Sequence, residues 1–335
     1  MTPVELSRTV LRAVRRAVDE GELSVAVPQR AVVAPPGPGG CGDYATNIAL
    51  QLARPAGQPP LRVAEILQQH LARTAGVADV VVTGPGFINI SLQGAAASAA
   101  ALTSEILREG MAYGHSDTLA GHVVELRIPY EIRAEVIADA LTRIVGSQGG
   151  RVEVDHREPA NLRPVPAPDD PALLGPDAAR WALLHPAAHD RPRITADHLV
   201  QRESNPLFRV RYACARTRAL SRNAADLGFT PEPGDVQEPE EAQADVREDT
   251  AVLLAALADH PRVLARAAAH RTPDSLARHL VTVADAVLAV VPTVLPRGDE
   301  KPSAAHRARL ALAEAAGTVL AGGLSLLGID APDHL

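Results

Sequence analysis

The sequence predicts an α+β module, then a small strand–helix–strand (βαβ) unit, and finally an all-helical bundle. Short apolar runs separated by Gly/Pro turns fill the first third of the chain. Two short apolar strands flank one helical stretch in the middle, and beyond residue 176 apolar residues recur at helical spacing. Aromatics are only 2% of the 335 residues, so the cores must be built from Ala, Leu and Val. The predicted segments are 1–115 (α+β module), 120–157 (βαβ unit), 158–172 (proline-rich linker) and 173–335 (bundle).

The first module opens with a helix. Thr2 suits the N-cap, Pro3 the first helical position and Glu5 a capping box. A strand is expected over 22–33, followed by a Gly/Pro-rich loop at 35–40. The remaining predicted elements are helices at 44–53, 61–73 and 95–110 and strands at 80–82 and 87–92, the strands meeting across Gly84-Pro85-Gly86.

The middle segment has the length of one βαβ unit. Residues 122–126 and 151–154 are apolar enough for two strands, and an amphipathic helix over 132–146 separates them. A proline-rich stretch without periodicity follows, which is typical of a linker. The helices expected in the bundle are 176–185, 195–227, 245–269, 274–291 and 303–327.

Charge is distributed unevenly along the bundle. The whole chain carries a net charge of -7, which excludes a uniformly basic nucleic-acid coat but not a local basic patch. Residues 232–249 are strongly acidic, whereas 201–222 are rich in arginine and include Phe208 and Tyr212. Both charge runs could simply be solvated, the basic one as a helix surface and the acidic one as a loop. For the basic run, contact with phosphates together with stacking on bases is the alternative. Its arginines form one stripe of Arg202, Arg209 and Arg216 and another of Arg211, Arg218 and Arg222.

Other classes of protein are not indicated. Cys41 and Cys214 have neither metal-site nor disulfide-framework spacing, and the histidines show no metal-binding spacing, so no metal and no bound cofactor are expected. The N-terminus lacks a signal-peptide pattern, and no long stretch is both apolar and uncharged. These patterns predict a cytoplasmic protein without a membrane span.

Several segments resemble parts of arginyl-tRNA synthetases. Gly42–Ala49 (GDYATNIA) and Gly84–Asn89 (GPGFIN) resemble the N-terminal additional domain of that family. Asn205–Arg216 (NPLFRVRYACAR) is similar to the opening of its helical anticodon-binding domain, the DALR domain. Gly175–Trp181 resembles the family's GADAxRY, and Leu326–Pro332 resembles its LLGIxAP ending. The resemblance implies that the βαβ unit is a remnant of a Rossmann-like catalytic domain.

The middle departs from the family pattern. Glu125 and Pro129 match the strand before the ATP-binding HIGH signature, but only Tyr130 and Glu131 separate Pro129 from the helix that should follow it. Where the KMSKS-like signature is expected, 161–166 contain no lysine, and Lys301 is the only lysine in the chain. A doubly wound nucleotide-binding fold also needs more chain than these segments provide. No catalytic residue is therefore predicted.

The resemblance also implies tRNA contacts. Phe87 and Asn89 match residues facing the D-loop, where Phe could stack and Asn could bond a base edge. For the anticodon loop the candidates are Asn205, Arg209, Tyr212 and Arg216, with Asn205 alternatively a helix cap. Arg209 stands where the family has a tyrosine, and Cys214 where it has a histidine. Additional phosphate contacts are expected from Arg202, Arg211, Arg218 and Arg222, and His334 and Leu335 match a terminal loop near the anticodon.

The favoured prediction is a tRNA-binding, non-catalytic paralogue, a pseudoenzyme connected with translation. Its partners would be tRNA, with arginine isoacceptors as first candidates, and a protein that uses the aminoacyl-tRNA; DNA and membranes are not expected. Two alternatives stay open. One is an arginine–tRNA ligase, divergent or completed by a partner chain, which would need ATP and arginine. The other is a protein-interaction module that docks a basic partner on the acidic loop.

Overall fold

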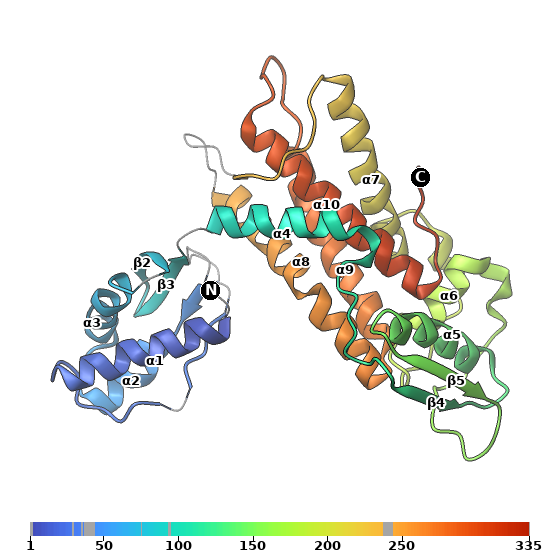
Figure 1. Ribbon diagram of the computed structural model, residues 1–335, viewed down its shortest axis with the longest axis horizontal. Coiled ribbons are helices and arrows are strands. Elements are labelled where there is room, and N and C mark those ends of the chain that lie inside the picture. Colours follow the sequence, from blue (N-terminus) through green and yellow to red (C-terminus); the bar gives the residue numbers. More distant parts are fainter. Residues whose placement is uncertain are drawn as a thin grey trace. The chain divides into compact units, whose positions relative to one another are not determined.

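The computed structural model describes residues 3–334 apart from 29, 35, 37–43, 75, 93–94 and 237–243. The chain forms two compact units, Met1–Ser98 and Ala99–Leu335, each with its own apolar core (Figure 1). The boundary falls inside helix α4 (Ala95–Glu109), so residues 99–115 pack with the second unit.

The first unit places helices against one face of a small antiparallel sheet. Strand β3 (Phe87–Leu92) lies between β1 (Tyr44–Thr46) and β2 (Val77–Thr83). Strands β2 and β3 form a hairpin with Val82 opposite Ile88. Apolar side chains of the helices, such as Leu6 and Leu67, share one core with Ile88 and Ile90 of β3. The elements are α1 (Pro3–Asp19), β1 (Tyr44–Thr46), α2 (Ile48–Ala56), α3 (Pro60–Ala72), β2 (Val77–Thr83) and β3 (Phe87–Leu92).

Two expected elements of this unit are wrong. In the described part of 22–33 the chain is irregular, held by the buried side chains of Leu23 and Ala31 and by a hydrogen bond from Ser7 Oγ to the Ala31 carbonyl. Residues 44–46 are a strand rather than the start of a helix, because they pair with β3. The helix begins only at Ile48, whose amide donates to Thr46 Oγ1.

The predicted βαβ unit is present in the second unit. Strands β4 (Val123–Arg127) and β5 (Arg151–Asp155) are parallel, and α5 (Ile132–Gly146) connects them. The Glu131 carboxylate caps α5 by accepting a hydrogen bond from the Ala134 amide at 3.0 Å. Leu126 and Leu141 belong to the same apolar core as the helical bundle, so the βαβ unit is part of that core.

The helices of the bundle follow the predicted periodicity closely. Helix α10 (Ala304–Leu327) is the most deeply buried. Gly323 lets it approach α9 (Pro273–Val290), because a Cβ there would lie 2.4 Å from Leu280 Cδ2. Helix α7 starts at Pro206 rather than at 195, because proline at the first helical position and Asn205 as N-cap begin it there. The helices are α6 (Pro176–Leu184), α7 (Pro206–Asp226), α8 (Ala244–His270), α9 (Pro273–Val290) and α10 (Ala304–Leu327). Short 3-10 turns are η1 (Gly110–Ala112), η2 (Pro171–Leu174), η3 (Ala196–Leu199) and η4 (Val291–Thr293).

Two segments of the bundle are long and apolar enough to cross a membrane, Pro273–Thr293 and Ala304–Leu327. Half of the first segment's most apolar window and 78% of the second's are buried inside the protein. The packing of the bundle accounts for the apolar character of both helices, since the core of a helical protein needs such faces.

A single arginine fastens the proline-rich segment to the bundle. Arg133, in the first turn of α5, is fully buried. Its guanidinium donates five hydrogen bonds of 2.7–3.0 Å to backbone carbonyls. The acceptors are the carbonyls of Val165, Leu183, Pro186, Ala187 and Asp190. Leu162 and Pro171, both within 158–172, are also buried, so the stretch expected to be a linker is packed on the protein.

Arg133→Met should lower the free energy of unfolding of the second unit by ~3 kcal/mol or more, because five carbonyls lose a donor. Of these, the Ala187 carbonyl keeps the Asp190 amide as a partner, and each buried group left unpaired costs ~1–3 kcal/mol. Trp181 is the only tryptophan and is buried in this unit, so its fluorescence during urea unfolding reports the change. Arg108→Met removes an exposed helical arginine and should change the free energy by less than ~0.5 kcal/mol. Equal stability of the two variants would contradict the fastening role of Arg133.

A buried histidine pair makes the second unit sensitive to acid. His260 of α8 stacks on Tyr113, with ring centroids 5.9 Å apart, and lies 5.3 Å from the ring of His279 of α9. Burial, with smaller effects of His279 and His115, lowers the pKa of His260 to about 3. Burial also lowers the pKa of His279. Both rings are therefore neutral in the folded protein at pH 7.

Because the folded-state pKa of His260 lies below its unfolded value, the unfolded chain binds a proton first as the pH falls. Below about pH 6.5 the free energy of unfolding should drop by ~1.4 kcal/mol per pH unit from this histidine alone, a loss that ends near its folded pKa. Urea unfolding followed by Trp181 fluorescence at pH 7 and pH 5 measures the slope. His260→Leu should flatten it, and an unchanged slope in that variant would contradict the assignment.

Candidate nucleic-acid interface

Helix α7 carries most of the predicted anticodon contacts, and the residue that caps its N-terminus is Asn205. Asn205 is 5% exposed. Its Oδ1 accepts hydrogen bonds from the amides of Leu207 and Phe208, and its Nδ2 donates to the carbonyls of His198 and Val200, both at 2.9 Å. These four bonds use the side chain fully. Asn205 is therefore an N-cap, the alternative given by the sequence, and we remove it from the anticodon-contacting set.

Three arginines of the basic run are paired with carboxylates of neighbouring elements. Arg209 Nη1 lies 2.8 Å from Asp285 Oδ1 of α9, and Arg211 Nη1 lies 3.4 Å from Asp177 Oδ2 of α6. Arg202, in the loop before α7, pairs with Asp197 at 2.7 Å. Arg209 and Arg211 are partly buried, so these two contribute to packing between helices as well as to charge.

The C-terminal tail, residues 328–334, engages two more arginines. Arg218 Nη1 lies 2.6 Å from Asp333 Oδ1 and donates to the Ala331 carbonyl at 2.8 Å. Arg222 Nη2 is 3.4 Å from His334 Nδ1. Two arginines of the second stripe, Arg218 and Arg222, thus face the protein's own tail, and a phosphate at Arg218 must compete with the Asp333 carboxylate.

The start of the tail is held firmly. Arg143 Nε donates to the Leu326 carbonyl and Arg180 Nε to the Leu327 carbonyl, so two cations satisfy the end of α10. Both arginines also pair with Asp139. Gly328 has a φ of 72°, and a Cβ there would lie 2.6 Å from Arg143 Nη2. Glycine at this position lets the two guanidinium groups reach the carbonyls.

One face of α7 stays open to solvent. Phe208 and Tyr212 are one helical turn apart and their rings are stacked, with centroids 5.5 Å apart. Tyr212 is 40% exposed. Arg216 follows one turn later and is exposed, and no carboxylate in the described part of the chain forms an ion pair with it. We call Phe208, Tyr212 and Arg216 the aromatic–arginine face. It offers one π surface and one cation.

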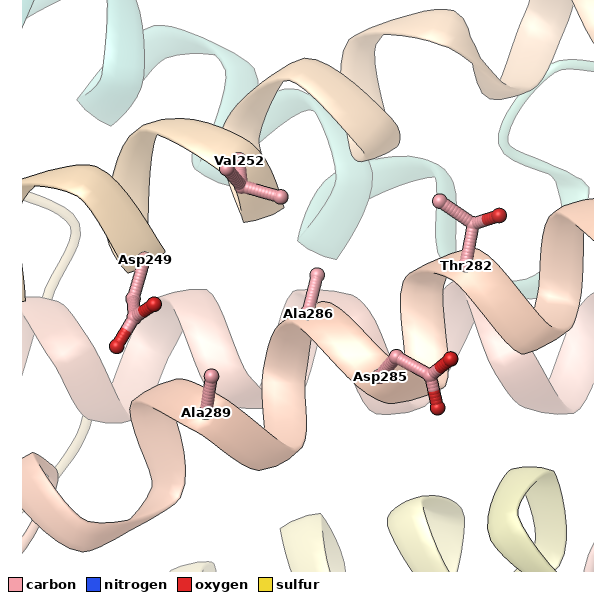
Figure 2. Close-up of a pocket in the computed structure, with 6 residues that line it drawn as sticks. All are labelled: Asp249, Val252, Thr282, Asp285, Ala286 and Ala289. Carbon is pink, nitrogen blue, oxygen red and sulfur yellow. The ribbon is translucent and has the colours of Figure 1, made fainter. Parts of the chain in front are cut away.

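A hollow of about 330 Å³ lies between α8 and α9 (Figure 2). Figure 2 shows Val252 of α8 opposite Ala286 of α9, with acidic side chains on both helices. Asp249 and Asp285 make the hollow electronegative, and Arg209 neutralises only Asp285. Such a lining suits a cation or an amide donor better than a phosphate. The sequence run 232–249 indicated acidity here but not a cavity, and its part 237–243 lies outside the described residues.

The two D-loop candidates of the first unit, Phe87 and Asn89, differ in their exposure to solvent. Phe87 is 42% exposed, whereas Asn89 is 2% exposed. Asn89 Nδ2 donates to Thr83 Oγ1 at 2.8 Å and to the Val81 carbonyl at 3.2 Å, which ties β3 to β2. Asn89 therefore supports the hairpin, and Phe87 alone remains available to a base. Gly86 permits the turn beside it, since a Cβ there would lie 3.0 Å from the backbone of Pro60.

One cluster has the composition of a metal site. Glu20 and Glu22 follow α1, and His70 lies in α3; their ligand atoms are all within 4.8 Å of one another. His70 is buried, and its Nε2 lies 2.6 Å from Glu22 Oε2. Two carboxylates and one imidazole could hold a divalent cation. Sequence spacing gave no signal for it because the histidine comes from a distant helix.

Cys214 is buried, and burial raises the pKa of its thiol, so it is a small core residue. Cys41, Leu335 and the first two residues of the GDYATNIA segment lie outside the described residues. His334 is exposed and contacts Arg222.

Each of the two units contains a segment that matches a known protein family. Residues 5–92 match the arginyl tRNA synthetase N terminal domain, and residues 210–335 match the DALR anticodon binding domain. The chain is 40% identical over 169 residues to an arginine–tRNA ligase of Renibacterium salmoninarum, covering 47% of this chain and 30% of that relative. It is 39% identical over 159 residues to that of Frankia alni, covering 44% of this chain and 28% of the relative.

The chain therefore carries two domains that arginyl-tRNA synthetases contain. It is an arginyl-tRNA synthetase-related protein, and it spans about 30% of the length of the curated relatives it matches. The crystal structure of an arginyl-tRNA synthetase from Plasmodium falciparum has a similar fold, with a TM-score of 0.63 at 9% identity over 99% of each chain.

Asn205→Ala should lower the free energy of unfolding by ~1–2 kcal/mol, because the first turn of α7 loses its cap. Urea unfolding monitored by Trp181 fluorescence measures the loss. Asn205→Asp keeps the capping oxygen and should fall between Ala and the unchanged protein. If Asn205→Ala kept full stability yet bound RNA more weakly, Asn205 would be a direct contact after all.

Proposed function

We propose that the protein is a non-catalytic tRNA-binding protein that works in the cytoplasm. The aromatic–arginine face carries this proposal, because Tyr212 and Arg216 lie exposed within the region that matches the anticodon-binding domain. Single-stranded RNA loops are commonly bound by aromatic rings that stack on bases and by arginines that contact phosphates. The anticodon loop is the part of tRNA with these features.

The binding mechanism we infer has a stacking and an electrostatic component. The Tyr212 ring stacks on Phe208, which holds it in place, so little further ordering is needed before it stacks on a base. Arg216 supplies a cation one turn along the helix. Of the other arginines, Arg218 and Arg222 become available to phosphate only where the C-terminal tail yields. In the first unit, Phe87 would stack on a base of the D-loop.

The lack of catalysis is part of the same proposal. Helix α5 begins at Ile132, directly after its cap Glu131, so no histidine-bearing stretch intervenes between β4 and α5. Lys301 is the only lysine available for a mobile phosphate-binding loop. The parallel sheet has two strands in the described part of the chain, fewer than a nucleotide-binding fold uses. We accordingly expect no ATP–pyrophosphate exchange with arginine and tRNA.

Filter binding of the purified protein to total tRNA across a salt series, with the bound species sequenced, tests the function. We expect salt-dependent binding, and enrichment of arginine isoacceptors would identify them as the partner. The proposal fails if no tRNA is retained at physiological salt. Salt-insensitive capture of a protein in the absence of RNA would favour the interaction-module alternative.

Two substitutions test the aromatic–arginine face. Tyr212→Ala should weaken tRNA binding by ~1–3 kcal/mol, the usual contribution of one stacked base. Arg216→Ala should weaken it and reduce the slope of log K against log salt by ~1. Arg262→Ala is the matched control, because Arg262 is an exposed helical arginine of α8 paired with Asp259. Equal affinities of all three variants would contradict the interface, and circular dichroism checks that Tyr212→Ala folds.

A further inference from the structure

The chain leaves helix α1 through a tightly bonded turn. The Gly21 amide donates to the Val18 carbonyl at 3.0 Å, and the Glu22 amide donates to the Ala17 carbonyl at 2.9 Å. Gly21 has a φ of 76°, a left-handed conformation that glycine adopts without strain. The turn sets Glu20 and Glu22 on either side of this glycine, so the backbone that carries both carboxylates is held in place.

Helix α3 brings a histidine to the same turn. Helices α1 and α3 pack against each other in the first unit (Figure 1). His70 lies in the last turn of α3, and only 7% of its side chain is exposed. Its Nε2 lies 2.6 Å from Glu22 Oε2, and ligand atoms of His70, Glu20 and Glu22 all lie within 4.8 Å of one another. One buried imidazole and two carboxylates therefore meet at one point.

The protein does not balance the negative charge at this point. Within the ranges that the structure describes, no arginine forms an ion pair with Glu20 or Glu22. Helices α1 and α3 also end here, and each helix C-terminus carries roughly half a unit of negative charge. His70 is the one group of the cluster that can be positively charged. Two carboxylates and two helix ends together favour an additional cation.

We propose that Glu20, Glu22 and His70 bind a divalent transition-metal ion of the zinc type, with water completing the coordination. Imidazole nitrogen combined with carboxylate oxygen favours zinc and its neighbours, whereas Mg²⁺ and Ca²⁺ prefer oxygen ligands. Zinc holds such atoms at about 2.0–2.2 Å, which places two ligand atoms of a tetrahedron about 3.3 Å apart. The His70–Glu22 contact must open by only about 0.7 Å to reach this spacing. Glu20 is exposed, so its side chain is free to rotate toward the ion.

Glu20 separates this proposal from a simple hydrogen bond between His70 and Glu22. A hydrogen-bonded pair needs no third group, and among the described residues the Glu20 side chain makes no hydrogen bond or ion pair of its own. A bound ion makes Glu20 a ligand. The ion then ties the turn after α1 to the last turn of α3, and its binding stabilises the folded first unit by mass action.

Zinc titration of the full chain, stripped of metal with a chelator and followed by calorimetry, tests the proposal. We expect zinc binding that Mg²⁺ at the same concentration does not reproduce. Glu20→Gln leaves the His70–Glu22 bond intact but should weaken zinc binding at least about tenfold, as the loss of even an outer-sphere partner usually does. Glu65→Gln is the matched control, because Glu65 is an exposed glutamate of α3 paired with Arg62. Equal zinc affinity of Glu20→Gln and the unchanged protein would overturn the proposal.

Amide hydrogen exchange locates the bound ion. Zinc should slow exchange of the Glu22 and Leu23 amides, which close the turn after α1, in the unchanged protein and in Glu65→Gln but not in Glu20→Gln. Zinc held by histidines elsewhere would leave these amides unaffected, and that result would overturn the site.

His70→Gln removes the nitrogen ligand and should abolish both the zinc binding and the slowed exchange. Circular dichroism checks its fold, and if this variant does not fold, Glu20→Gln decides. No RNA is present in these measurements, so their outcome is independent of the proposed function.

Discussion

The Arg133 guanidinium is the interaction on which the second unit depends most. Five backbone carbonyls converge on it, from the end of α6, from the loop beyond α6 and from the proline-rich segment. Four of the five carbonyls lie outside helices and strands, so they lack the partners that regular secondary structure would supply. No other side chain offers five donors in one plane. One residue at the start of α5 thus fixes the path of three segments and lets the βαβ unit share its core with the bundle.

That shared core gives the βαβ unit a structural purpose independent of any reaction. Leu126 and Ile128 from the β4 region and Ile137, Leu141 and Ile144 from α5 are buried in the cluster that contains the bundle helices. Removing the unit would expose this surface on α5's partners. A protein that uses only the helical domain for binding would still need these strands and this helix, because they complete the apolar core beside α8 and α10.

Periodicity predicted α5, α6, α8, α9 and α10 well, since each places an apolar stripe in the core. It failed at 22–33, where buried Leu23 and Ala31 anchor an irregular path, and at 44–46, where pairing with β3 outweighed local helix preference. The residues available for RNA contact were harder to predict than the helices, because their partners come from distant parts of the chain. Asp285 lies 76 residues from Arg209 in the sequence, and a charge run does not reveal such partners. Asn89 and Asn205 are no longer candidates for RNA contact, because both side chains are buried and bonded within the protein. Their polarity in the sequence does not reveal this.

The fastened C-terminal tail changes how the basic surface would respond to ions. Asp333 is in effect a counter-ion attached to the protein by its own chain, which Arg143 and Arg180 anchor at the end of α10. When a polyanion displaces it, the carboxylate stays nearby instead of diffusing away. Arg218 then adds less net positive charge to the interface than a free arginine would. The number of ions exchanged on binding would be smaller than the number of arginines in contact, because that number follows net neutralised charge.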